Sequence, residues 1–211
     1  MTKVFAISGS LVTENLENLG ELAQALESHE EQVIAVTGAG GLKEYIHAAG
    51  NFGNQGEQDL VGITGTRLNA KTLMTAMDAY PKVPETAYEI REAASTGKNV
   101  VMGGLTPGHS TDAVAAIAAE LLEADLYIAT RIDGVYDRDP DEEGAEKFEE
   151  IGLDELRKVI SGNNEAGGHE LIDGTAVDII ERSSIETKLF LGTNENIENP
   201  GEADGTTVVL D

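Results

Sequence analysis

Three short apolar runs in this sequence each end in a loop that contains glycine. The loops are Ser8-Gly9-Ser10, Thr37 to Gly41, and Gly103 to Gly108. A loop of this kind between a strand and a helix points unpaired backbone N–H groups, and the positive end of a helix dipole, at one spot. Such a spot suits an anion, and the commonest biological anion is phosphate.

One glycine loop by itself is more typical of a plain strand-to-helix turn, but three together at one sheet edge favour a polyphosphate site. Phosphoryl transfer is mostly positioning and charge stabilisation, so backbone donors and a few cations suffice for it. Such a reaction needs a donor site and an acceptor site side by side. The basic residues next to the loops are candidates for the cations, with surface counter-ions as the alternative for each: Lys43, Arg67, Lys71 and Arg131.

Other nucleotide and metal motifs are absent or incomplete. No Gly-x-x-x-x-Gly-Lys-Ser/Thr is present, which argues against a P-loop NTPase. Gly38-x-Gly40 begins a dinucleotide fingerprint, but Lys43 stands in place of its third glycine, so a Rossmann dehydrogenase is a weak rival. The aspartates from Asp137 to Asp141 have calcium-loop spacing, yet Phe148 replaces the closing carboxylate. No metal-ligating residues are therefore predicted.

Four histidines are scattered without metal-ligand spacing. Only His109 falls inside a candidate site, next to the third glycine loop. We expect structural or exposed positions for His29, His47 and His169.

Short β-rich runs alternate with segments of helical period, which predicts an α/β fold with a mainly parallel sheet covered on both faces. The predicted strands are 4–7, 32–36, 99–102, 126–130, 188–191 and 207–210. The predicted helices are 19–26 (with Asn18 and Glu21 as capping partners), 42–49, 59–79 (stopped by Tyr80-Pro81), 86–94, 114–122 and 173–182, with a glycine-rich loop at 50–56.

The composition indicates a folded, strongly acidic protein. There are 39 Asp and Glu residues against 14 Lys and Arg, a formal net charge of -25, while 40% of residues are apolar. Binding to nucleic acid or to an anionic membrane is therefore excluded as a function class, and a salt-rich cytoplasm is expected. The 211 residues suit a single domain over 1–211, without cysteine, signal peptide or membrane span, so the expected location is cytoplasmic.

Several motifs resemble those of archaeal-type uridylate kinases, members of the amino-acid kinase superfamily. Met102-Gly103-Gly104-Leu105-Thr106-Pro107-Gly108-His109-Ser110-Thr111-Asp112-Ala113 is similar to the family's Met-Gly-Gly-Thr-His-Pro-Gly-His-Thr-Thr-Asp-Ala. Thr130 to Tyr136, followed by Asp139-Pro140, resembles its nucleotide-binding Thr-Asn-Val-Asp-Gly-Val-Tyr and Asp-Pro. Segments 66–70 and 179–185 also fit, so the resemblance spans nearly the whole chain.

The resemblance implies transfer of the γ-phosphoryl group of ATP to UMP, giving UDP in pyrimidine nucleotide biosynthesis. It implies a three-layer αβα sandwich, commonly a homohexamer, with Mg²⁺ held mainly through phosphates. The residues that it assigns to UMP are Gly38, Asp59, Leu105, Thr106, Pro107, Gly108, His109, Ser110 and Thr111. Those that it assigns to ATP are Ser8, Gly9, Ser10, Ala39, Lys43, Thr130, Tyr136 and Asp139, with Lys43 and Asp112 as the catalytic pair.

The chain departs from the family pattern at four positions: Ser8, Ala39, Lys43 and Leu105. Side-chain atoms at Ser8 and Ala39 crowd backbone that approaches a phosphate, and lysine lacks the bidentate fork of arginine. Two alternatives to a uridylate kinase therefore stand. One is a nucleotide-binding regulatory or storage protein on the same fold, and the other is a kinase of another small phosphorylated acceptor.

Overall fold

The computed structural model describes residues 2–14, 16–163 and 172–210. Its centre is a seven-stranded sheet of order β3-β2-β1-β4-β6-β7-β5, in which β6 and β7 pair antiparallel and all other neighbours pair parallel. The strands are β1 (Thr2–Ile7), β2 (Gln32–Thr37), β3 (Val100–Met102), β4 (Asp125–Thr130), β5 (Glu150–Gly152), β6 (Thr187–Leu191) and β7 (Gly205–Val209). The apolar runs of β1 and β2 are buried, as expected for strands covered on both faces.

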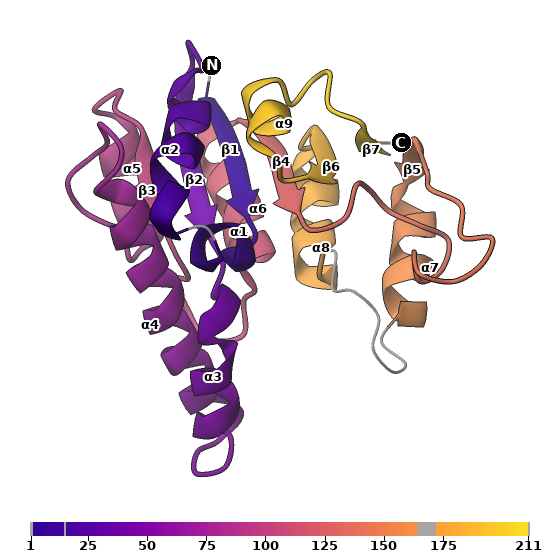
Figure 1. Ribbon diagram of the computed structural model, residues 1–211, viewed down its shortest axis with the longest axis horizontal. Helices are drawn as coiled ribbons and strands as arrows, with labels where there is room; N and C mark the ends of the chain where they lie inside the picture. The colour runs from indigo at the N-terminus through magenta and orange to yellow at the C-terminus, as the bar shows by residue number, and fades with distance from the viewer. Residues whose placement is uncertain (1, 15, 164–171, 211) are drawn as a thin grey trace.

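Helices cover the sheet on both faces (Figure 1). They are α1 (Gly9–Thr13), α2 (Leu19–Glu27), α3 (Lys43–Ala49), α4 (Gln55–Met74), α5 (Ala87–Ala94), α6 (Thr111–Leu122), α7 (Leu153–Asn163), α8 (Gly174–Ser183) and α9 (Asn194–Glu198), with short 3₁₀ turns at Leu16–Asn18 and Gly40–Leu42. The helix α6 packs against α5 and against α8 in one layer, whereas α2 contacts α9 in the other. The pair α3 and α4 extends beyond the carboxyl ends of the first strands (Figure 1).

The predicted α/β architecture with a mainly parallel sheet is confirmed, and all six predicted strands are present within two residues of their expected ends. The strand β5 was not predicted, because it is three residues long and only Ile151 within it is buried. The helix α7 was also missed, although Leu153, Leu156 and Val159 give it a buried apolar face.

The boundaries predicted for the long helix are wrong at both ends. The helix α4 begins at Gln55, four residues before the expected start, because Asn54 and Glu57 form a capping box, and Gly56 therefore lies inside the helix rather than in a loop. It ends at Met74 instead of reaching Ala79, since the chain tightens there into turns whose N–H groups bond to carbonyls three residues back.

The capping partnership predicted for Asn18 and Glu21 is also wrong. Asn18 precedes α2 but makes no side-chain capping bond. The Glu21 carboxylate instead accepts a hydrogen bond from Asn194 Nδ2 at 3.4 Å. A tertiary partner on α9 thus takes the place of the local cap.

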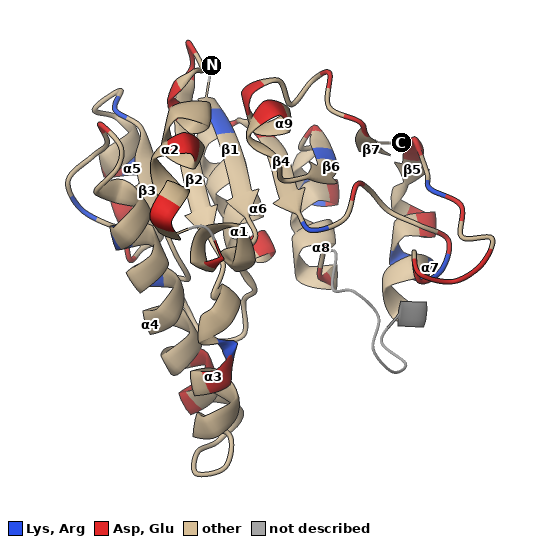
Figure 2. Cartoon of the chain, viewed as in Figure 1, with Lys and Arg blue, Asp and Glu red and all other residues tan. Residues whose placement is uncertain are grey.

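Acidic residues occur in many of the helices and loops, while Lys and Arg occupy fewer positions (Figure 2). Most of the basic side chains form ion pairs, for example Arg182 with Glu120 and Arg157 with Asp178 and Glu181. In the described ranges, no helix is both long and apolar enough to cross a membrane.

Candidate functional site

The first two glycine loops touch each other at the carboxyl edge of the sheet. Because β1 and β2 are parallel neighbours, both loops leave the sheet at this edge, and the Gly38 N–H donates to Ile7 O at 2.9 Å. A Cβ atom on Gly38 would lie 2.7 Å from Gly9 N, and one on Gly9 would overlap the backbone of residues 38–40. Glycine at both positions is what allows the two backbones to meet.

The third loop packs against α4. A Cβ atom on Gly103 would lie 2.7 Å from Arg67 N, and the Gly104 N–H donates to the Thr66 hydroxyl at 2.8 Å. Arg67 donates to the carbonyls of Gly104 at 3.0 Å and Leu105 at 3.4 Å. The Nη1 atom of the same guanidinium forms an ion pair with Glu85 at 2.7 Å. Arg67 therefore holds the loop in place.

Beyond Leu105 the third loop is exposed and is held at its far end by α4. The Gly108 N–H donates to Asp59 Oδ2 at 2.8 Å, and Gly108 has a φ of +83°, which glycine adopts without strain. Thr106 and His109 face each other, with Thr106 Oγ1 3.2 Å from His109 Nδ1. Residues 105–109, which were predicted to surround the acceptor, thus form an open loop anchored to the predicted ribose ligand Asp59.

The loop continues into α6, whose first turn holds Thr111 and Asp112. Ser110 caps this helix by accepting the Ala113 N–H at 3.0 Å. The Ser110 hydroxyl in turn donates to Asp173, which caps α8. Thr111 lies over the second loop, since a Cβ atom on Gly38 would be 3.5 Å from its hydroxyl. The start of α6 therefore lies next to the first two glycine loops, whose backbones touch each other.

The predicted donor side begins where β4 ends beside the first loop. The Ser8 N–H donates to Ala129 O at 3.0 Å, and the neighbouring Thr130 carbonyl accepts the Gly192 N–H at 2.8 Å. The hydroxyls of Ser8 and Ser10 lie 3.0 Å apart. The structure therefore brings the ends of β1 and β4 together, as the prediction requires.

The segment after β4 is fixed by a small ionic cluster. Lys147 contacts Asp133 at 3.1 Å and Asp204 at 2.7 Å, and the Tyr136 hydroxyl donates to Asp133 at 2.8 Å. Burial by itself raises the pKa of Asp133, but the bonds from Tyr136 and Lys147 outweigh it and leave that pKa below its ordinary value. The same bond raises the pKa of Tyr136. Asp139 lies farther along and accepts the Asp141 N–H at 2.9 Å.

The four candidate cations have different surroundings. Arg67 binds the third loop, and Arg131 pairs with Glu14 at 3.0 Å, with both side chains largely exposed. Lys43 is the first residue of α3, directly after the second loop, and its side chain is exposed. Within the described ranges neither Lys43 nor Lys71 has an ion-pair partner. Of these two lysines, Lys43 follows the second loop directly, so its charge remains available beside the glycine loops.

The histidines outside the site agree with the prediction where the structure describes them. His29 lies under α9, 2.8 Å from Ile197 O, and burial lowers its pKa. His47 is exposed on α3, and His169 lies outside the described residues. No group of three or more His, Asp or Glu side chains within the described chain is arranged to hold a metal ion.

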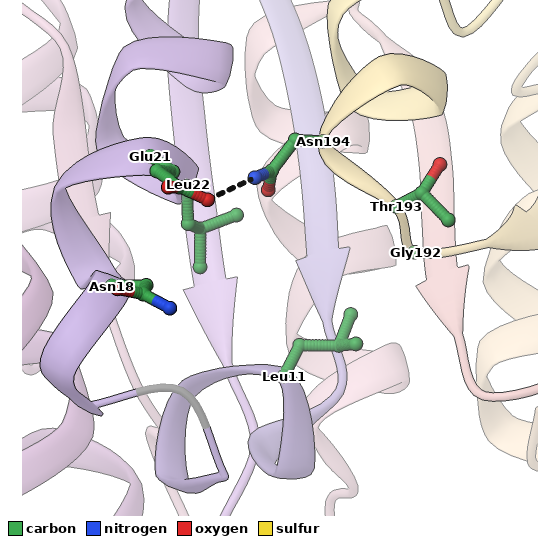
Figure 3. Close-up of a pocket in the computed structure, with 7 residues that line it drawn as sticks. All are labelled: Leu11, Asn18, Glu21, Leu22, Gly192, Thr193 and Asn194. Atoms are coloured by element: carbon green, nitrogen blue, oxygen red, sulfur yellow. Dashed lines mark hydrogen bonds between the residues drawn. The ribbon is translucent and has the colours of Figure 1, made fainter.

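A cavity of about 190 Å³ lies next to the first loop, between α1, α2 and the segment after β6 (Figure 3). Its lining residues are Leu11, Asn18, Glu21, Leu22, Gly192, Thr193 and Asn194. No predicted site residue lines it. The predicted residues instead form the open edge described above.

Comparison with known proteins identifies the family. The profile of the amino acid kinase family matches residues 1–190. The chain belongs to the amino acid kinase family. It is 41% identical to the uridylate kinase of Archaeoglobus fulgidus over 99% of this chain and 100% of that protein. It is 40% identical to the uridylate kinase of Methanobrevibacter smithii over 99% of both chains.

Solved structures of the same family agree with the fold. The crystal structure of the Archaeoglobus fulgidus uridylate kinase aligns with a TM-score of 0.88 at 38% identity, covering 99% of this chain and 100% of that chain. A UMP kinase from Ureaplasma parvum aligns with a TM-score of 0.78 at 21% identity, covering 99% and 98%. The predicted amino-acid kinase fold is thereby confirmed.

Some contacts at this edge of the sheet could not be predicted from the sequence. Thr66 holds the third loop, and Asp173 binds the cap of α6, yet the sequence indicated only helical positions for both. The sequence did contain a signal for Thr66, because it belongs to the segment Thr66-Arg67-Leu68-Asn69-Ala70, which fits the family. That segment did not indicate which group Thr66 contacts. For Asp173 the sequence offered nothing beyond a helix start.

Proposed function

We propose that this protein transfers the γ-phosphoryl group of ATP to UMP, producing UDP and ADP. The observation that carries the proposal is the backbone contact between the first two glycine loops, flanked by the third loop on one side and the end of β4 on the other. The two loops in contact could hold the phosphate groups of a donor and an acceptor nucleotide, with one nucleotide bound on each side. The full-length similarity to uridylate kinases supports UMP as the acceptor.

On the acceptor side, we assign UMP to Gly38, Asp59 and residues 105–111. Asp59 Oδ2 is taken by the Gly108 N–H, which leaves its second oxygen for a ribose hydroxyl. The exposed segment 106–109 would then close over the uracil and the acceptor phosphate, with the N-terminus of α6 near that phosphate.

On the donor side, we assign ATP to residues 8–10, Ala39, Lys43, Thr130, Tyr136 and Asp139. An oxygen of the UMP phosphate attacks the γ-phosphorus while the bond from that phosphorus to the bridging oxygen of ADP breaks. Lys43 would stabilise negative charge on the transferred group, and Asp112 at the start of α6 would orient the catalytic groups. Mg²⁺ would be held by phosphate oxygens and water.

A coupled assay of ADP formation tests the proposal. The purified protein is given ATP with UMP, CMP or another phosphorylated acceptor in turn, and we expect the highest kcat/KM with UMP. Measurable ATP binding without turnover of any acceptor would favour a nucleotide-binding regulatory or storage protein. A higher kcat/KM with an acceptor other than UMP would favour the second alternative, a kinase of another small phosphorylated acceptor.

We further propose that residues 1–211 form one amino-acid kinase domain and that the protein assembles as a homohexamer in a salt-rich cytoplasm. Exposed apolar side chains on the paired helices α3 and α4, including Tyr45 and Leu60, support self-association. So does Phe52 in the turn that joins these helices. Light scattering after size exclusion in molar potassium chloride tests the assembly, and a monomeric mass would contradict it.

A further inference from the structure

Asn69 is a buried polar residue in the middle of α4. Its side chain is 4% exposed, and it lies among buried neighbours that include Ala70 and Leu73. Asparagine is a poor helix former, and burial of an amide costs free energy unless the amide is hydrogen-bonded. The position therefore calls for specific partners outside the helix.

Both partners belong to the second glycine loop. Asn69 Nδ2 donates to Gly38 O at 2.7 Å and to Ala39 O at 3.2 Å. One residue earlier, the Thr37 hydroxyl donates to Thr66 O at 2.9 Å, so the end of β2 is also bound to this helix. The two amide hydrogens of a single side chain thus hold two consecutive carbonyls of the loop.

These two bonds fix the direction of the loop's amide hydrogens. In a trans peptide, the carbonyl and the following N–H lie in one plane and point in opposite directions. The carbonyls of Gly38 and Ala39 face α4, so the N–H groups of Ala39 and Gly40 face away from it. Among the described residues neither N–H has a hydrogen-bond acceptor in the protein.

We propose that Asn69 is a positioning residue for phosphoryl transfer, which turns the N–H groups of Ala39 and Gly40 toward the transferred phosphate. This inference rests on the proposed function. Donors that are aimed before the reaction need no reorganisation as negative charge develops. A loop without Asn69 could still bind nucleotides, but its peptide planes would be free to turn.

A purely structural role for Asn69 predicts a different result. In that case Asn69 only joins α4 to the sheet, as the fully buried Leu73 does on the same helix. Among the described residues no hydrogen bond joins Leu73 to the loop. Loss of Asn69 would then lower the thermal stability of the protein and leave the turnover of folded enzyme unchanged. Leu73→Val is therefore the matched control.

The experiment compares the full-length wild-type protein with Asn69→Ala and Leu73→Val. For each protein, Tm is measured first, and kcat and KM for ATP and UMP are measured well below the lowest Tm. Removal of one donor to a transition-state oxyanion lowers kcat by about 100- to 1000-fold, and since Asn69 acts through the loop we expect about 10- to 100-fold for Asn69→Ala. Both KM values should change by less than about threefold, and Leu73→Val should keep the wild-type kcat.

Asn69→Ser provides a second variant should Asn69→Ala not fold. It leaves a smaller polar group whose single hydroxyl is too short to reach both carbonyls, so a similar loss in kcat is expected. A wild-type kcat in either folded variant, or an equal loss in Leu73→Val, would overturn the positioning role. Absence of turnover in the wild-type protein would instead overturn the proposed function.

Discussion

Substitution of Asp59 by alanine should weaken UMP binding far more than ATP binding. The partly buried carboxylate accepts the Gly108 N–H at 2.8 Å through Oδ2. In the described part of the chain Oδ1 contacts no protein donor, so it is available to a ribose hydroxyl. A hydrogen bond to a charged group contributes about 1.5–3 kcal/mol.

That range predicts the size of the effect. Each 1.4 kcal/mol is a factor of ten in Kd, so loss of the ribose bond should weaken UMP binding by about 10- to 150-fold. Release of the Gly108 N–H frees the acceptor loop and adds to the loss. The Kd of ATP should change by less than about twofold, because the one hydrogen bond of the Asp59 carboxylate within the described ranges is to the acceptor loop.

Calorimetric titration of UMP, and separately of a non-hydrolysable ATP analogue, measures both constants. Asp78→Ala is the matched control, since this carboxylate is 91% exposed and, among the residues that the structure describes, pairs only with Lys98. The control should bind both nucleotides as the wild type does. Equal weakening of both ligands in Asp59→Ala, or a change of less than threefold for UMP, would refute the acceptor-side assignment.

Four further predictions address the donor side, the loop contact and the charge. Asp139→Ala should weaken ATP binding more than UMP binding in the same titrations, and the reverse order would contradict its donor-side assignment. Gly9→Ala should abolish most turnover, because its Cβ overlaps the second loop, whereas Gly20→Ala, with open space around it, should keep wild-type kcat in the coupled assay. The hydrogen bond from Arg182 lowers the pKa of Glu120. The Tm of Glu120→Gln should therefore lie below that of the wild type by a full, constant amount above the ordinary pKa of 4.5, and this difference should disappear as the pH falls through the lowered pKa. A Tm difference that does not change with pH would argue against the ion pair. Because the net charge is -25, Tm should rise from dilute buffer to molar potassium chloride, and a constant or falling Tm would contradict destabilising self-repulsion.

The sequence by itself determined the fold class and the chemistry of the loops. The apolar runs of β1 and β2 are long enough, and are followed closely enough by glycine, to be recognised as buried parallel strands. Because parallel strands end at the same edge of a sheet, the sequence pattern alone predicted that the loops lie beside one another. The resemblance of residues 102–113 to a known motif then indicated the family, which full-length similarity confirmed.

Local sequence did not determine the ends of several elements. The end of α4 at Met74 follows from a series of tight turns that the apolar period did not reveal. The expected cap at Asn18 is absent, and Glu21 bonds instead to Asn194, which is distant in the chain. The strand β5 exists because its backbone pairs with β7, far along the chain, and not because of its own three residues. Such contacts leave little trace in local periodicity.

Only the tertiary structure decided which side chains hold the loops and which remain available. Arg67 and Arg131 are both basic residues near the predicted site, yet one binds the third loop and the other pairs with Glu14, while Lys43 remains exposed beside the second loop. The sequence pattern indicates only a helical position for Asn69, whereas in the folded protein its amide donates to two loop carbonyls. The physical reason is that hydrogen bonds and ion pairs act over a few ångströms between residues that can be thirty or more positions apart in the chain, a separation that local sequence patterns do not encode.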